Sequence, residues 1–167
     1  MATKLRHTIT CPFGMSAYVA ALSDPEYWAT LAVGTPDAPG ELESTDITDT
    51  AAEIHLIQRI PSDKLPSAVS GLISGDLSIH RGVELTFDDA DHTTGTFDAV
   101  VSGAPATVRG TINASGTADE TTVEFSGTVT VRIPLVGGKI EKMIAANLTD
   151  LFDAERDFTV AWHEEHR

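Results

Sequence analysis

Three polar residues stand where the apolar alternation of a strand would place an interior side chain. They are Arg81, Gln58 and His7. Successive side chains of a strand point to opposite faces, so residues two apart share a face. Each of the three lies an even number of positions from apolar residues of its own strand. Around Arg81 these are Leu77, Ile79, Val83, Leu85 and Phe87. Around Gln58 they are Ile54, Leu56 and Ile60, and around His7 they are Leu5 and Ile9. Without a bulge, these three polar side chains project inward.

Arg81 is the most demanding of the three. A buried guanidinium costs several kcal/mol unless it is paired and hydrogen-bonded. Arg81 therefore needs a protein carboxylate, ordered water or an acidic ligand group. A structural explanation is favoured over a ligand: an ion pair with an acidic residue such as Glu155, or a bulge near Gly82 that turns Arg81 outward.

The other two candidates are weaker. Gln58 stands on a strand expected to neighbour that of Arg81, so the two side chains could share one polar spot. A histidine such as His7 on an apolar face is more often a satisfied core residue than a general base. Arg81, Gln58 and His7 are the candidate ligand-binding residues, and no catalytic residue is assigned.

Motifs for cofactor or metal chemistry are missing from the chain. It has no nucleophile elbow, phosphate-binding glycine loop, dinucleotide fingerprint or zinc-binding helix motif. The acidic run 88–92 lacks the spacing of a calcium loop and is typical of a hairpin turn. His163 and His166, three residues apart near the end, could bind a metal, but a frayed, solvated tail is the favoured expectation. We therefore expect no cofactor and no bound metal.

The elements that must position these residues follow from periodicity and turn residues. An alternating strand is expected at 5–10, then a short helix capped by Ser16 and running to Leu22, then a second short helix that begins at Asp24-Pro25 and ends near Gly34. Proline and glycine predict a loop over 34–40. Further strands are predicted at about 41–48, 51–60, 77–87, 95–102, 105–115 and 121–133.

Two more segments complete the pattern. The stretch 61–76 begins with Pro61, contains Leu65, Val69, Leu72 and Ile73, and is interpreted as a short helical turn. From about Lys139 an apolar residue recurs every three or four positions, which predicts a long amphipathic helix. The stripe consists of Ile140, Ile144, Leu148, Leu151, Phe152, Phe158 and Trp162. The prediction is an α+β fold: a seven-stranded curved antiparallel sheet with two short helices after its first strand and a long C-terminal helix.

Size and charge restrict the function further. At 167 residues the chain is expected to form a single domain, 1–167. Its formal net charge of −14, from 25 acidic and 11 basic residues, disfavours nucleic acid and anionic membranes as partners. The lone Cys11 excludes an internal disulfide. With no signal-peptide pattern and no run of about 18 apolar residues, we expect a cytoplasmic protein without stable membrane insertion.

The order of elements resembles the START-like superfamily, the helix-grip fold that includes the birch-pollen allergen and polyketide cyclases. Two runs resemble one uncharacterised, mostly actinobacterial family of domains of unknown function: VRIPLVGGKIE at 131–141 and GAPATVRGT at 103–111. The resemblance implies an internal cavity and carries no catalytic residue. A tryptophan typical of the family near the end of the 77–87 strand is absent here, which changes the expected cavity shape.

Three hypotheses for function remain. The leading one is a non-catalytic binder or carrier of a small hydrophobic or amphipathic molecule, such as a lipid, polyketide or isoprenoid, with Arg81 orienting its head group. The second is a cyclase or hydratase with His7 as general base and Arg81 polarising a carbonyl, which requires both to reach one pocket. The third is a protein-interaction module with a packed interior. A homodimer through an edge strand is also compatible with the sequence.

Overall fold

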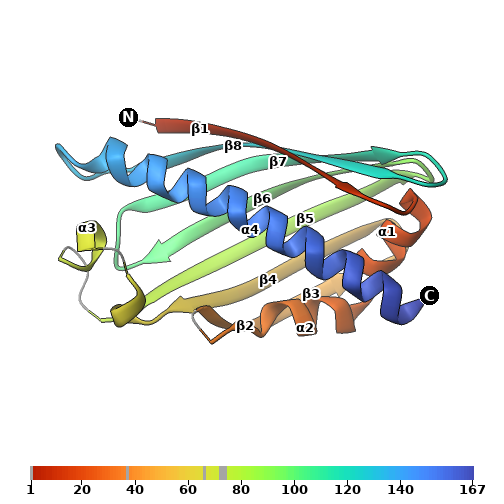
Figure 1. Cartoon of the computed structure of the whole chain (residues 1–167), viewed down its shortest axis with the longest axis horizontal. Coiled ribbons are helices and arrows are strands. Elements are labelled where there is room, and N and C mark those ends of the chain that lie inside the picture. Colours follow the sequence, from red (N-terminus) through yellow and green to blue (C-terminus); the bar gives the residue numbers. More distant parts are fainter. Residues whose placement is uncertain (1, 37, 66, 72–74) are drawn as a thin grey trace.

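A computed structural model of the chain describes residues 2–36, 38–65, 67–71 and 75–167. One antiparallel sheet carries a long helix diagonally across one face (Figure 1). This face is called the inner face below. The helix is α4, Gly137–His166, and at 30 residues it is about 45 Å long. The α+β helix-grip arrangement predicted from the sequence is confirmed.

The sheet has eight strands in the order β1-β8-β7-β6-β5-β4-β3-β2. Each strand pairs with its sequence neighbour, except that β1 closes against β8. The strands are β1 Ala2–Cys11, β2 Gly34–Thr35, β3 Ala38–Ile47, β4 Ala51–Ile60, β5 Leu77–Asp89, β6 His92–Ser102, β7 Ala106–Gly116 and β8 Thr121–Val131.

The region predicted as a loop over 34–40 holds the extra strand. Gly34, with φ of +69°, lets the chain turn back sharply after the second helix, and β2 then pairs with the start of β3. The sheet therefore has eight strands rather than the seven expected. β1 and the short β2 form its two edges.

The short helices match the prediction apart from one cap. α1 spans Met15–Leu22 and α2 spans Pro25–Ala32. Asp24 caps α2 by accepting a hydrogen bond from the Glu26 amide at 2.9 Å. Ser16 is not the cap of α1: the N-cap is Gly14, two residues earlier, and the helix starts at Met15. A Cβ at Gly14 would lie 2.4 Å from the Ala118 carbonyl oxygen, so close packing against the β7–β8 turn fixes that start.

The segment expected to form a helical turn contains a 3-10 helix, Ser62–Lys64, and the short α3, Ser67–Ser70. Leu72, Ile73 and the side chain of Val69 lie outside the described residues. Among the helices that are described, none is both long enough and apolar enough to cross a membrane.

The interior beneath the middle of α4 is filled by aromatic rings. Phe152 of α4 stacks on Phe125 of β8 with ring centroids 4.0 Å apart, and Phe97 of β6 meets both edge-on. Gly110 and Gly127 leave room for the Phe97 ring, since a Cβ at either would approach it within 2.4 or 3.1 Å. This packing joins α4 to the β6–β8 half of the sheet.

Candidate functional site

Arg81 points to the inner face and forms an ion pair with Glu155 of α4. Its Nη2 lies 2.7 Å from Glu155 Oε1, and the two side chains are only 15% and 22% exposed. The pairing of β5 with β4 and β6 is continuous through Arg81 and Gly82. The bulge alternative is therefore wrong, and the ion-pair alternative with Glu155 is the one found. A further role for Arg81 in ligand binding stays a prediction.

Gln58 lies close to this ion pair. Arg81 faces Leu56 across the β4–β5 pairing, and Gln58 is two residues further along β4 on the same face. Such diagonal neighbours are about 7–8 Å apart. The Gln58 amide is half-buried and makes no hydrogen bond with any residue that the structure describes. Two of the three predicted polar residues thus share one region of the inner face.

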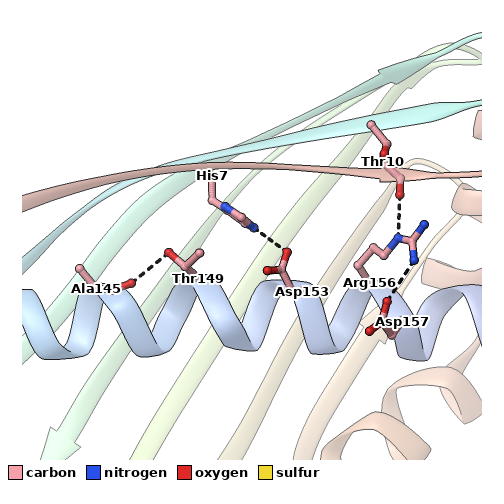
Figure 2. Close-up of polar contacts among 7 residues, drawn as sticks. All are labelled: His7, Thr10, Ala145, Thr149, Asp153, Arg156 and Asp157. Carbon is pink, nitrogen blue, oxygen red and sulfur yellow. Dashed lines mark hydrogen bonds and ion pairs between the residues drawn. The ribbon is translucent and has the colours of Figure 1, made fainter.

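His7 has a different environment. Figure 2 shows it pointing from β1 toward α4, where its Nε2 lies 2.7 Å from Asp153 Oδ1. Its ring also lies against that of Phe152. One turn along, Arg156 Nε donates to the Thr10 carbonyl oxygen of β1 at 2.8 Å. His7 is thus one of the contacts that attach α4 to the edge strand.

The structure does not bring His7 and Arg81 together. Their strands, β1 and β5, are four positions apart in the sheet, or about 19 Å at the usual strand spacing. Their partners Asp153 and Glu155 are two residues apart on α4, which places them about 200° around the helix axis. The two side chains lie on opposite sides of α4, so the shared pocket that the cyclase hypothesis requires is not formed.

Tyr27 extends the polar region of Arg81 and was not identified from the sequence. The Thr159 hydroxyl donates to the Glu155 carbonyl oxygen at 2.7 Å, so the Tyr27 hydroxyl must donate to Thr159, 2.8 Å away. Burial raises the pKa of Tyr27 above its usual value, and the Glu155 charge adds to that shift. Tyr27 therefore stays neutral, with its proton already engaged.

Tyr18 of α1 is the second residue that sequence reasoning missed. It is 7% exposed, yet its hydroxyl makes no hydrogen bond with the described residues. Burial is the main cause of its raised pKa, and the nearby Tyr27, Cys11 and Glu155 raise it further. A buried tyrosine usually has a hydrogen-bond partner. That rule flags Tyr18 and Tyr27, but nothing local in the sequence indicates that their neighbours come from α4.

The inner face is unevenly covered. α4 has β1 and β8 as its main strand neighbours. Apolar side chains of β7 and β8 beneath it are buried: Val108, Ile112, Val123 and Val129. By contrast, several apolar residues of β5, β6 and the facing side of α4 are only partly buried: Val83, Phe87, Ala99, Val101, Ile144 and Leu148. Arg81 borders this partly covered area through Ala99, its β6 partner, whereas Leu56, its β4 partner, is buried.

Three pockets lie away from this area. One of about 630 Å³ is formed by α1, the β7–β8 turn and the end of α4. Another, of about 470 Å³, lies on the outer face over β1, β7 and β8, and a third, of about 580 Å³, lies at the β8–α4 junction. None of the three is lined by Arg81, Gln58 or His7.

Comparison with known sequences gives a family and no activity. Residues 6–162 match the family described as "Protein of unknown function (DUF2505)". An uncharacterised protein of Mycobacterium tuberculosis is 32% identical over 155 residues, which cover 85% of this chain and 86% of that protein. An uncharacterised protein of Mycobacterium bovis matches equally well.

Solved structures share the fold at low sequence identity. Norcoclaurine synthase from Thalictrum flavum aligns with a TM-score of 0.57 and 16% identity, covering 99% of this chain and 96% of that one. Protein Ms6760 from Mycobacterium smegmatis aligns with a TM-score of 0.60 and 9% identity, covering 98% and 92%. At these identities the likeness concerns the fold alone.

Proposed function

Since the chain belongs to the DUF2505 family of proteins of unknown function, we propose its role from geometry: it binds a small hydrophobic or amphipathic molecule on the inner face, between α4 and strands β5 and β6. The observation that carries this proposal is the partly covered apolar area around the Arg81–Glu155 pair. Covering about 200 Å² of it with a ligand would contribute about 5 kcal/mol of binding free energy.

The polar groups in this area favour an uncharged head group. Glu155 already neutralises Arg81, so a carboxylate or phosphate placed there would meet the Glu155 charge. The Gln58 amide and the Tyr18 hydroxyl are uncharged and make no hydrogen bond with the described residues. They could bind a hydroxyl or carbonyl group on a long apolar ligand.

The fold likeness supports binding without assigning a reaction. One norcoclaurine synthase structure is a complex with dopamine and hydroxybenzaldehyde, so in that protein the fold accommodates small molecules. The enzyme hypothesis based on His7 and Arg81 loses its geometric basis, because α4 separates them.

Two measurements test the proposal. Native mass spectrometry of protein purified from its own host should show a co-purifying mass of lipid size. In thermal-shift and probe-displacement assays at pH 8, methyl dodecanoate should bind at least about tenfold more tightly than dodecanoate, which differs from it chiefly by carrying a charge.

A matched pair of variants locates the site. Ala99→Trp fills the inner face beside Arg81, because Ala99 is the β6 partner of Arg81. Val100→Trp places the same ring on the outer face, where Val100 is 48% exposed. Only Ala99→Trp should abolish ligand binding. Equal binding by both variants would exclude the inner face, and clean protein with no thermal shift across a lipid panel would contradict binding altogether.

The aromatic packing of Phe152, Phe125 and Phe97 favours a second candidate, an interaction module with a filled interior. That candidate predicts no ligand mass and no ligand-induced thermal shift for the wild-type chain. The first experiment therefore separates the two.

A further inference from the structure

Leu135, between β8 and α4, is exposed and strained at the same time. Its side chain is fully exposed, and its φ of +73° lies in the left-handed region that non-glycine residues avoid. The following Val136 is also exposed. Short backbone bonds hold this conformation: Val136 N donates to Pro134 O and Gly137 N to Ile133 O, both at 2.9 Å. A fully exposed leucine buries no apolar surface on folding, so folding stability does not account for it.

The charge around this turn is opposite to that of the whole chain. From Ser126 to Thr149 the sequence has three basic residues, Arg132, Lys139 and Lys142, and one acidic residue. That acid, Glu141, is fully buried and accepts hydrogen bonds from within the protein. All three basic side chains are exposed and form no ion pair with the described residues. In a protein of net charge −14, this is a local positive area.

We propose that the β8–α4 turn, Arg132–Lys142, docks on an anionic lipid surface, with Leu135 and Val136 entering the interface and Arg132, Lys139 and Lys142 contacting lipid phosphates. This inference goes beyond the proposed ligand binding and does not depend on it. An exposed apolar tip with exposed basic side chains close by in the sequence is the composition of an interfacial membrane anchor.

Two further features agree with this partner. The pocket of about 580 Å³ at this junction is lined by Leu135, Pro134 and Arg132, among others, which offers space beside the tip for a lipid group. Acidic residues elsewhere on the molecule are screened beyond about 8–10 Å at physiological salt, so the local positive charge governs close approach. Docking of this kind is peripheral and involves no membrane-spanning segment.

Vesicle co-sedimentation of the full chain tests the proposal. At physiological salt, vesicles of phosphatidylcholine with about 30% phosphatidylglycerol should bind the protein, and pure phosphatidylcholine should bind several-fold less. Binding should fall as the salt concentration is raised further, because the contacts between basic side chains and lipid phosphates are then screened as well. Leu135→Gly should weaken vesicle binding about tenfold. The same substitution should raise the melting temperature, because glycine adopts the positive φ without strain. A purely structural Leu135 would not give this combination.

Control variants sharpen the result. Val33→Ser removes another apolar side chain, which is 64% exposed and lies about 100 residues before Leu135 in the sequence. Vesicle binding by this variant should stay within about twofold of that of the wild-type chain. Lys139→Gln should weaken binding about fivefold, whereas Arg59→Gln, on β4, should not.

Three outcomes would overturn docking on lipid. One is a wild-type chain that does not sediment with anionic vesicles at physiological salt, where the distant acidic residues are screened. Another is unchanged vesicle binding by Leu135→Gly. The third is a concentration-dependent dimer of the wild-type chain that Leu135→Gly abolishes, since this would show that a second copy covers the turn.

Discussion

At the scale of single residues, the Arg81–Glu155 ion pair links the stability of the fold to the presence of both partners. Both side chains are mostly removed from solvent and come from elements far apart in the sequence. Removing water from two charges costs several kcal/mol, and their attraction recovers that cost only while both partners are present. Each residue is therefore required mainly because the other one is there.

This predicts a strongly non-additive pair of substitutions. Arg81→Met should lower the free energy of unfolding by about 2–4 kcal/mol, because it leaves Glu155 buried without its partner. Adding Glu155→Met should recover most of that loss. Arg59→Met, which breaks the exposed Arg59–Glu41 pair on the outer surface, should cost less than about 1 kcal/mol. Urea denaturation measures all three, and additive effects of the two inner substitutions would contradict this account.

Glu141 is the other buried charged residue that the fold depends on. It is fully buried; its Oε1 accepts from the Thr3 hydroxyl and its Oε2 from the Val131 amide, both at 2.9 Å. It thereby joins the start of α4 to both β1 and β8.

Two substitutions of Glu141 distinguish the contribution of its charge to stability from the contribution of its hydrogen bonds. Glu141→Leu leaves the Val131 amide and the Thr3 hydroxyl without a partner and should destabilise the fold by about 2–4 kcal/mol. Glu141→Gln can accept from Val131 through its oxygen and donate to the Thr3 oxygen through its nitrogen, so it should cost less than about 1 kcal/mol. Thermal unfolding compares them; equal stability of the two variants would show that these bonds matter little.

At the scale of elements, the packing of β6, β7 and β8 depends on a glycine. Gly110 lies between Phe97 and Ser126, and an added Cβ would stand 2.4 Å from the Phe97 ring and 2.4 Å from the Ser126 carbonyl oxygen. The ring could move, but the backbone oxygen belongs to the paired strand β8.

Gly110→Ala should therefore lower the free energy of unfolding by more than about 2 kcal/mol, because it forces β7 and β8 apart. Gly71→Ala is the control, since no atom of the described residues, its chain neighbours apart, lies within 4 Å of the position that its Cβ would take. Chemical denaturation of the two variants tests this. A Gly110→Ala protein as stable as Gly71→Ala would mean that the sheet absorbs the extra methyl group without cost.

α4 is the element that divides the inner face. One side of it contacts β1 through His7–Asp153 and Thr10–Arg156 (Figure 2). The other side carries Glu155 toward Arg81. Its stripe was predicted from periodicity, but the direction in which it crosses the sheet determines which strands it covers. That direction leaves the β5–β6 area partly open.

At the scale of the whole molecule, the loss of folding stability at alkaline pH depends on ionisable side chains that are buried in the interior. The chain has two tyrosines and one cysteine, and all three are buried. Burial raises the pKa of the Cys11 thiol to about 11 and holds the pKa of both tyrosines above the usual range. Folding thus stabilises the neutral forms.

Stability should be complete below about pH 9 and should fall as the pH rises through 11, because the unfolded chain releases these protons first. Cys11 alone would contribute a loss of about 2–3 kcal/mol, and Cys11→Ala should remove that part. Tyrosinate absorbance should appear only together with loss of near-ultraviolet circular dichroism. Tyrosinate formed in protein that is still folded would contradict the buried position of Tyr18 and Tyr27.

Net charge also limits which partners the protein is expected to bind. The excess of acidic residues still predicts no nucleic-acid partner, and the cytoplasmic location and the homodimer through an edge strand remain predictions. The proposed lipid contact shows why net charge is a poor guide to one surface: three of the eleven basic residues lie in the β8–α4 turn segment, Arg132–Lys142, where the only acidic residue is the buried Glu141.

Periodicity and turn residues were enough to predict the α+β class, all but one short strand of the sheet, the long C-terminal helix and the inward direction of Arg81, Gln58 and His7. Those properties follow from local periodicity, since neighbouring residues alone decide which face of a strand or helix is apolar. The folded chain was needed to select Glu155 as the partner of Arg81 among the alternatives, to place His7 on the other side of α4, and to bring Tyr18 and Tyr27 near Glu155. These relations depend on how α4 crosses the sheet, which is set by packing between residues more than 70 positions apart.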